Sequence, residues 1–144
     1  MTQALSVLEA FDGHDVFLMT NRFPTVDGFT HRDIRNVYYL KFFGFGFLRT
    51  MLTCLYNSLL CIKIFIKERP SIIFSTGSDI TVPAFYLGRF VFRCKLIYLE
   101  SWERVSAPSL NSRAVYRITD LFLVQCKSLL PCFGKKAKYF GTVL

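Results

Sequence analysis

Two short apolar runs, each ending in small polar or charged residues, constrain the fold of this chain more than any other feature. The first run is SIIFSTGSD at residues 71–79, and the second is KLIYLESWER at residues 95–104. The segment between them has the pattern of a helix, so the whole stretch predicts a strand, a helix and a second strand. In a βαβ unit of this kind the strands run parallel, and ligands bind outside their carboxyl ends. We therefore expect the functional chemistry where each run ends.

The remaining elements extend this pattern along all 144 residues. Helices are expected at residues 1–11, 48–67, 80–92, 110–118 and 127–132, and strands at 14–20, 34–40, 72–75, 96–100, 121–125 and 137–140. Asp12-Gly13 is expected to end the first helix, with the glycine in the position after the C-cap. The order α-β-β-α-β-α-β-α-β-α-β predicts an α/β fold, a Rossmann-like parallel sheet with helices on both faces. The length suits a single domain, residues 1–144, with a full hydrophobic core.

Composition narrows the classes of partner. Hydrophobic residues make up 52% of the chain, with 16 Phe and 7 Tyr, and the net charge is +8. So many aromatic side chains must be buried, covered by a partner or placed at a lipid interface. Positive charge combined with excess aromatics favours a membrane surface and lipid phosphates. No nucleic-acid partner is expected, because the sequence shows no RNA-binding aromatic motif, zinc finger or helix-turn-helix signal.

The cysteines predict neither a metal site nor a disulfide framework. Their number is five, no pair has CxxC spacing, and no histidine is placed to complete a set of ligands. We interpret them as reduced thiols that serve as small hydrophobic side chains. No metal and no cofactor are expected.

The first candidate site is the loop after residues 72–75, formed by Ser75, Thr76, Gly77 and Ser78. Gly77 permits a close backbone approach, and Ser78 is a candidate N-cap for the following helix. Free N–H groups at a helix start favour an anion, so the loop is expected to contact a phosphate, a sugar or a partner. The alternative is an ordinary turn between a strand and a well-capped helix.

The second candidate site follows the next strand and consists of Glu100, Ser101 and Arg104. A carboxylate at the end of a central strand can accept a sugar hydroxyl or act as a base, which makes Glu100 the candidate catalytic residue. Arg104 is expected to hold a phosphate, with a local ion pair to Glu100 or Glu103 as the alternative. Asp120 is predicted to end the preceding helix or to cap the next strand. His14 and His31 are predicted to be structural, because no Ser or Cys partner in a nucleophile motif accompanies them.

A third candidate is a membrane contact formed by Phe42, Phe43, Phe45, Phe47 and Arg49. These aromatics precede a helix that is apolar on most of its faces, and aromatics next to cations suit the headgroup layer of a membrane. The alternative is a core helix under the sheet. No signal peptide and no charge-free window of about 20 residues is visible, so we expect a peripheral or monotopic protein rather than a spanning one.

Several motifs together resemble a known family. They are FSTGS at residues 74–78, IYLESWERV at 97–105, DLFLVQ at 120–125 and YFG at 139–141. In this order they resemble the membrane-anchoring subunit of the two-subunit UDP-N-acetylglucosamine transferase of dolichol-linked oligosaccharide assembly. They are similar also to its bacterial counterparts in capsule, exopolysaccharide and O-antigen clusters. The likeness runs over nearly the whole chain and is densest at residues 70–141.

The resemblance implies the acceptor-side, N-terminal half of a split GT-B glycosyltransferase. Such a subunit lies on the cytoplasmic face of a membrane and presents a polyprenyl-diphosphate-linked acceptor. A separate small soluble subunit binds the UDP-sugar, and the chain is expected to be inactive without it. The residues that match the family's motifs are Ser75, Thr76 and Gly77 in the first loop and Glu100, Ser101 and Arg104 in the second.

One departure from the family concerns the start of the fold. The family has a first strand that ends in a Gly-Gly-His loop, and the sequence at residues 2–8 resembles the helix that follows this loop. We therefore expect a start upstream of Met1, with a fold that begins on a helix as the alternative. Two other functions stay open, namely a stand-alone α/β enzyme that binds nucleotide sugars and an inactive truncated scaffold.

Overall fold

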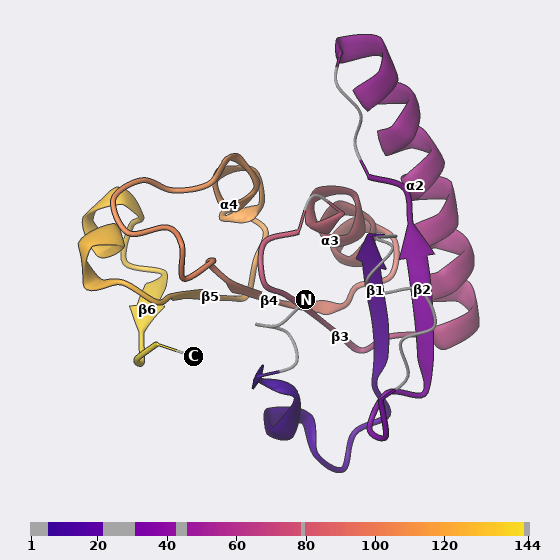
Figure 1. Cartoon of the computed structure of the whole chain (residues 1–144), viewed down its shortest axis with the longest axis horizontal. Helices are drawn as coiled ribbons and strands as arrows, with labels where there is room; N and C mark the ends of the chain where they lie inside the picture. The colour runs from indigo at the N-terminus through magenta and orange to yellow at the C-terminus, as the bar shows by residue number, and fades with distance from the viewer. Residues whose placement is uncertain (1–5, 22–30, 43–45, 79, 143–144) are drawn as a thin grey trace.

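The strands form two parallel sheets. The structure, a computed structural model, describes residues 6–21, 31–42, 46–78 and 80–142. One sheet has the order β3-β4-β5-β6 and the other pairs β1 with β2 (Figure 1). The strand bounds are β1 Phe17–Asn21, β2 Asn36–Leu40, β3 Ile72–Ser75, β4 Lys95–Leu99, β5 Leu121–Val124 and β6 Ala137–Tyr139. The predicted α/β fold with parallel strands is confirmed, but among the described residues the sheet is divided in two.

The helices follow the predicted order. Their bounds are η1 Leu8–Phe11, α2 Phe47–Glu68, α3 Thr81–Phe90, α4 Leu110–Val115 and η2 Lys127–Cys132. The first and the last are short 3-10 helices, and residues 1–5 of the first predicted helix lie outside the described residues. Gly13 has a φ of +77° just after η1, as expected for the residue that ends it. α2 ends with Arg69 in the left-handed region, directly before Pro70.

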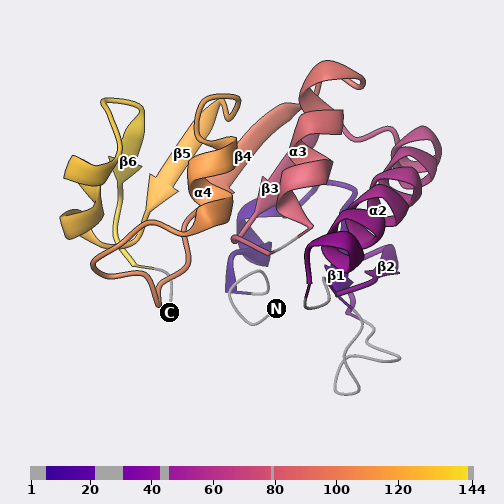
Figure 2. The same ribbon diagram turned by 90° about the horizontal axis from the view of Figure 1, so that it is seen from above.

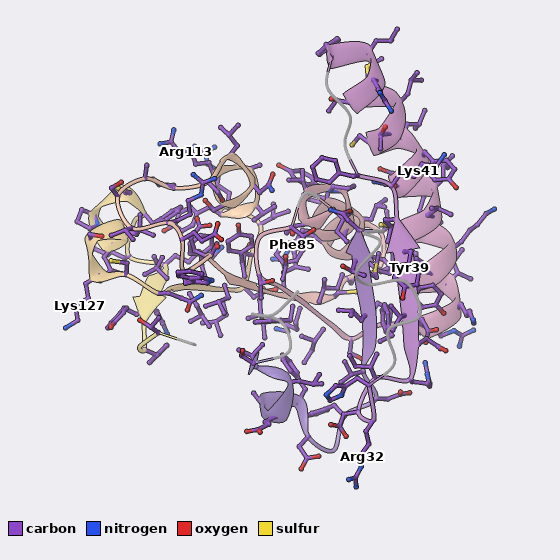
Figure 3. All side chains as sticks on the ribbon, viewed as in Figure 1. Arg32, Tyr39, Lys41, Phe85, Arg113 and Lys127 are labelled. Atoms are coloured by element: carbon purple, nitrogen blue, oxygen red, sulfur yellow. The ribbon has the colours of Figure 1, made fainter. Side chains whose placement is uncertain are left out.

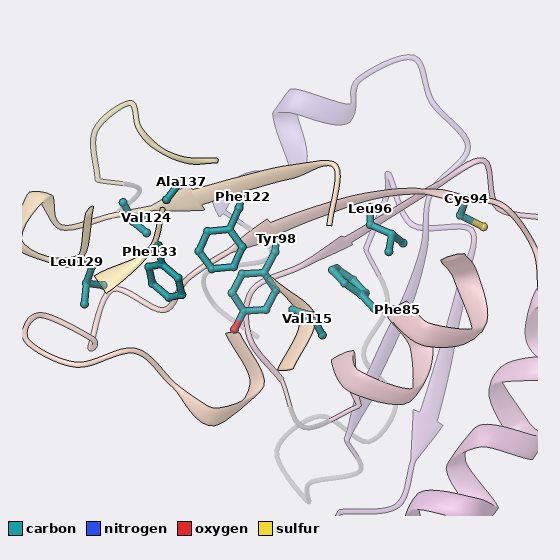
Figure 4. Packing of buried hydrophobic residues seen from close by; sticks show 10 residues of the cluster. All are labelled: Phe85, Cys94, Leu96, Tyr98, Val115, Phe122, Val124, Leu129, Phe133 and Ala137. Atoms are coloured by element: carbon teal, nitrogen blue, oxygen red, sulfur yellow. The ribbon is translucent and has the colours of Figure 1, made fainter. Parts of the chain in front are cut away.

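Alternation along β4 and β5 builds the main core. Leu96, Tyr98, Phe122 and Val124 are all fully buried, whereas their neighbours Ile97 and Leu123 point to the other face and are only half-buried. The rings of Tyr98 and Phe122 stack with centroids 5.0 Å apart, and Phe133 lies 4.6 Å from Phe122 (Figure 4). This cluster continues to Phe85 of α3 and Val115 of α4.

The two faces of the four-stranded sheet are covered unequally. α3 and α4 lie over one face, and η1 lies on the opposite side (Figures 1 and 2). Phe11 of η1 packs on Phe74 of β3 with ring centroids 5.2 Å apart. Both faces therefore receive a helix, as predicted, but the second face receives only one short turn among the described residues.

α2 joins the two sheets through its C-terminal half. Cys61, Ile64 and Phe65 pack with Leu40 of β2 and Ala84 of α3 in a second core cluster. The first buried side chain along α2 is that of Asn57, which donates to the carbonyl of Lys41 (2.8 Å) and accepts from its N–H (3.2 Å). Residues 47–56 consequently extend beyond the body of the molecule (Figure 1).

Candidate functional site

The two predicted loops meet at the carboxyl ends of β3 and β4. Gly77 has a φ of +93°, and a Cβ placed on it would lie 3.0 Å from Tyr98 Oη and 4.0 Å from Glu100 Oε1. A side chain at this position would therefore press on Tyr98, which makes Gly77 the residue that lets the first loop lie on the second. The two predicted loops therefore lie side by side, and we call the surface that they share the crevice. Ligand binding at this surface stays a prediction.

The first loop is held by its own hydroxyls and by α4. The N–H of Gly77 donates to Ser75 Oγ (3.2 Å), and Ser75 Oγ shares a hydrogen bond with Thr81 Oγ1 at the start of α3. Asn111 Nδ2 of α4 donates to the carbonyl of Gly77 (3.3 Å). Thr76 and Ser78 are half-buried beside these contacts. The loop is thus held by a hydrogen bond within itself, by the start of α3 and by α4.

The prediction that Ser78 caps α3 is wrong. The helix begins at Thr81, three residues later, and Ile80 stands in the capping position without a side-chain cap. The carbonyl of Ser78 accepts from the N–H of Thr81 (3.0 Å), so a single turn separates Ser78 from the helix. The Ser78 side chain is therefore not used at the helix start.

Glu100 is the centre of the second loop. It is fully buried, and its carboxylate accepts from the N–H groups of Ser101 (3.2 Å) and Ser109 (3.3 Å). The hydroxyl of Ser109 donates to it at 3.0 Å, and Tyr98 Oη lies at 3.5 Å. Gln125 Nε2 donates to the Glu100 carbonyl (2.9 Å). Such a set of donors satisfies a buried carboxylate and ties residues 101–109 to the end of β4.

These contacts show that the Glu100 carboxylate stabilises the loop of residues 101–109. Ser109 accepts from the N–H of Ser112 and so caps α4, which places one end of the loop at a helix start. Burial is the main cause that raises the pKa of Tyr98, and the charge of the neighbouring Glu100 raises it further. The Tyr98 hydroxyl therefore stays neutral at cellular pH. The catalytic contact predicted for Glu100 stays a prediction, and this geometry favours action through the loop.

Ser101 and Arg104 lie on the accessible side of the loop. Ser101 is half-buried, Arg104 is exposed, and the Arg104 N–H donates to the Ser101 carbonyl (3.0 Å). The alternative ion pair of Arg104 with Glu100 or Glu103 does not form in the part of the chain that the structure describes. Its guanidinium therefore points to solvent at the crevice rim. Trp102 is exposed as well, which excludes a core role for it.

Three residues of this site were missed by sequence reasoning, namely Tyr98, Ser109 and Asn111. A signal for one of them existed, because serine after a proline and before an apolar segment is a common N-cap. No local pattern in the sequence indicates that the Tyr98 hydroxyl contacts Ser109 or that the Asn111 side chain donates to the Gly77 carbonyl. Both contacts join segments far apart in the sequence.

Asp120 has the structural role that was predicted for it. Its carboxylate accepts from the Leu96 N–H (2.8 Å) and from Arg89 Nη1 (3.0 Å), which fixes β4 and α3 to the start of β5. Burial opposes ionisation, but the Leu96 N–H and Arg89 outweigh it, and the pKa of Asp120 lies below its usual value. His14 lines the same cavity as Ser75, Thr76 and Ser78, and His31 Nδ1 accepts from the Asp33 N–H (3.3 Å).

The predicted membrane contact lies just before α2 and in its first turn. Phe47 is 86% exposed, and Phe42 and Arg49 are also exposed, whereas Phe43 and Phe45 lie outside the described residues. Seven exposed apolar side chains in the first part of α2 follow a helical spacing and form one stripe, which we call the α2 stripe: Phe47, Leu48, Met51, Leu52, Leu55, Tyr56 and Leu59. Ile66, near the end of α2, is exposed as well. Figure 3 shows the side chains of this end of α2 standing away from the rest of the molecule.

α2 combines the two roles left open for it. Its C-terminal half is a core helix, and its N-terminal half exposes the α2 stripe. Among the described residues it is also the one helix whose length and apolar composition would be enough to cross a membrane. Glu68 is its single acidic residue, so the exposed half carries no negative charge.

Comparison with known proteins places the chain in a family. The sequence profile described as "Oligosaccharide biosynthesis protein Alg14 like" matches residues 31–143. The chain is 29% identical over 107 residues to the UDP-N-acetylglucosamine transferase subunit ALG14 of Candida albicans, which is 70% of this chain and 48% of that protein. It is 38% identical over 84 residues to the ALG14 subunit of Debaryomyces hansenii, which is 55% of this chain and 36% of that protein.

The chain thus spans about half the length, or less, of these curated relatives. No solved structure is significantly similar to it. The family profile covers most of the chain, including both crevice loops and the whole of α2. The chain therefore belongs to the Alg14-like family of oligosaccharide biosynthesis proteins.

Proposed function

We propose that this chain is the acceptor-side subunit of a two-subunit glycosyltransferase that uses a UDP-sugar. Its tasks are to bind a membrane surface, to present a polyprenyl-diphosphate-linked acceptor and to bind and activate a small soluble catalytic subunit. The observation that carries the proposal is the α2 stripe, seven exposed apolar side chains on one helix of a chain from a family of transferase subunits.

The surroundings of the α2 stripe suit a membrane interface. Lys41 and Arg49 are exposed beside it, and the Lys41 ammonium lies 4.3 Å from the ring centre of Tyr56. An amphipathic helix with cationic neighbours inserts its apolar side at the boundary of headgroups and acyl chains. Because the other half of α2 is packed against the protein, we propose peripheral or monotopic attachment. The cytoplasmic face is proposed from the family resemblance alone.

The crevice suits the diphosphate end of the acceptor. Arg104 offers an exposed guanidinium on one loop, and Ser75, Thr76 and Ser78 offer hydroxyls on the other. We assign Glu100 to positioning, because its buried carboxylate holds residues 101–109 in place. Ser101 lies at the joint between Glu100 and Arg104, so it belongs to the same surface.

The reaction itself needs the second subunit in this scheme. The acceptor hydroxyl attacks C1 of the sugar, the bond from C1 to the UDP oxygen breaks, and a base takes the hydroxyl proton. Contacts to the UDP phosphates stabilise the leaving group. We assign the parallel α/β sheet of this chain to the N-terminal half of a split GT-B enzyme. Donor binding then falls to the partner.

Two biological settings are compatible with the proposed function. The curated relatives are yeast subunits whose printed name specifies UDP-N-acetylglucosamine, which favours lipid-linked oligosaccharide assembly. Bacterial capsule or O-antigen synthesis is the second setting, suggested by the resemblance of the motifs at residues 74–78, 97–105 and 120–125 to bacterial counterparts. The lipid carrier of the acceptor that copurifies with the protein distinguishes the two.

The test is affinity purification of the tagged chain from gently solubilised membranes, followed by mass spectrometry and a transfer assay. We expect a small UDP-sugar-binding protein to copurify, and we expect Arg104→Ala to lose transfer while keeping the partner. Lys138→Ala, an exposed change on β6, is the matched control and should keep both. Recovery of a monomer that transfers sugar alone would establish the stand-alone enzyme instead. Unchanged transfer by both Arg104→Ala and Glu100→Ala would favour a scaffold.

A further inference from the structure

The end of β1 carries a buried acceptor that no donor in the described part of the chain satisfies. Asn21 is the last residue of β1 and is 6% exposed, and its Oδ1 is buried without a hydrogen-bond partner. Among the described residues it is the one buried side-chain nitrogen or oxygen in this state. Buried polar groups are normally paired, because an unmade hydrogen bond costs the desolvation of the group. The Asn21 oxygen therefore needs a donor from outside these residues.

The other buried amide side chains show what a structural role looks like. Asn57 donates to the Lys41 carbonyl (2.8 Å) and accepts from the Lys41 N–H (3.2 Å). Gln125 donates to the Glu100 carbonyl (2.9 Å). Each of these two amides joins two segments of the chain, whereas the Asn21 oxygen joins none within the described residues. Holding the fold together thus does not explain why an amide stands at position 21.

Asn21 lies at the end of β1 that is nearest to the first crevice loop. It pairs in register with Leu40 of β2, and Leu40 packs with Ile80, two residues after Ser78, in the second core cluster. Met19 packs against the same cluster and lines one cavity of about 650 Å³ together with Ser78. Side chains two residues apart on a strand share a face, so Asn21 lies on the side of β1 that α2 and α3 cover.

The surroundings of this oxygen favour a hydroxyl as the donor. α3 begins at Thr81, and Ile80 stands in its capping position without a side-chain cap. The N–H groups at an uncapped helix start favour an acceptor atom. A hydroxyl both donates and accepts, so it suits a carbonyl oxygen near such a helix start. An ammonium group would serve only the carbonyl oxygen, and a phosphate oxygen would serve only the helix.

We propose that Asn21 is a recognition residue for the acceptor sugar, and that its Oδ1 accepts a hydrogen bond from a sugar hydroxyl. The assignment rests on the proposed function, in which the sugar of the acceptor reaches the crevice. A carboxamide takes up no proton near neutral pH, so the role is recognition rather than base catalysis. Because the oxygen is covered in the free chain, the sugar reaches it with a local movement at the end of β1.

The first test compares two buried amides in the purified chain. Asn21→Leu replaces an unpaired oxygen with apolar atoms of similar volume, so we expect the urea midpoint to stay the same or to rise. Asn57→Leu is the matched control. It breaks two hydrogen bonds with Lys41 and should lower the midpoint by roughly 1 M. An equal loss in the two variants would show that the Asn21 oxygen has a partner within the chain, and it would overturn the proposal.

The second test measures sugar transfer by the complex that copurifies with the tagged chain, with a lipid extract of the source membranes as the acceptor. We expect Asn21→Leu to raise the KM for the acceptor at least about tenfold and to leave the KM for the UDP-sugar unchanged. A general loss of structure would change both values.

The outcomes separate this assignment from the proposed function. An unchanged acceptor KM in a complex that transfers sugar would overturn the role of Asn21 and leave the proposed function standing. A native complex that transfers no sugar would refute the proposed function, and the assignment with it. A stable Asn21→Leu chain with a raised acceptor KM is the result that the proposal predicts, because a recognition residue exchanges stability for binding.

Discussion

The four-stranded sheet and the two-stranded sheet are built from parallel strands of the same kind, but different things cover their apolar side chains. Around β4 and β5 the chain closes its own core, with Tyr98 and Phe122 fully buried under α3 and α4. Around β1 and α2 the chain leaves a cavity of about 650 Å³ and the exposed α2 stripe. The difference shows that the same kind of parallel strand can be fully covered in one region and leave apolar side chains exposed in the other.

The largest expected effect is on the closed core. Phe122→Ala removes a buried ring that packs on Tyr98, Tyr116 and Phe133, and we expect a loss of about 3–5 kcal/mol in the free energy of unfolding. Leu52→Ala on the α2 stripe is the matched control, with an expected change within about 0.5 kcal/mol. Urea unfolding measures both. Similar losses for the two variants would mean that the α2 stripe is covered in solution. This result would contradict the difference between the closed core and the exposed stripe.

Next in size is the loop that Glu100 holds. Glu100→Ala leaves the buried donors of Ser101 and Ser109 without an acceptor, and we expect a loss of about 2–3 kcal/mol. Glu100→Gln keeps an acceptor oxygen and should lose less. Proteolysis of residues 101–109 should be faster in the alanine variant only. Equal stability of all three proteins would show that these hydrogen bonds do not support the crevice.

Gly77→Ala tests the contact between the two loops. The alanine would have to keep a φ of +93° with its Cβ 3.0 Å from Tyr98 Oη, so we expect about 1–2 kcal/mol of destabilisation. Gly46→Ala is the control, because its φ is +100° and no atom lies within 4 Å of the added Cβ. A smaller loss at Gly77 than at Gly46 would contradict the close approach of the loops.

The smallest expected effect is a pH dependence in the two-stranded half. The Glu68 side chain is 1% exposed, and hydrogen bonds from Tyr38 first, and then from Arg35 and Asn36, hold its pKa below its usual value although burial opposes them. A lowered folded pKa adds stability above the unfolded value of about 4.3, and this stability is lost as the pH falls through the folded pKa. Urea unfolding at pH 6 and pH 3.5 should therefore show a steeper acid loss in the native protein than in Glu68→Gln. Parallel losses would exclude this role.

The order of elements and the proximity of the two loops could be predicted from the sequence, because both depend on local patterns that place strand ends at one edge of a parallel sheet. The apolar runs at residues 72–75 and 95–99 became β3 and β4 with polar residues at their ends. The start of α3 was predicted to within one residue, but its cap was misplaced at Ser78, because no local signal distinguishes the turn after Ser78 from a capped helix. The division of α2 into a packed half and an exposed half depends on where β2 and α3 end, which periodicity alone does not contain.

The most direct test of the central claim is flotation of the purified chain with vesicles of phosphatidylcholine and phosphatidylglycerol. We compare the native chain with Leu52→Glu/Leu55→Glu on the α2 stripe and with Val91→Glu at an exposed apolar position outside it. The account predicts that the native chain and Val91→Glu float with the vesicles, and that the double variant stays at the bottom with unchanged unfolding. Flotation of all three to the same extent, or of none, would contradict the assignment of the α2 stripe to the membrane.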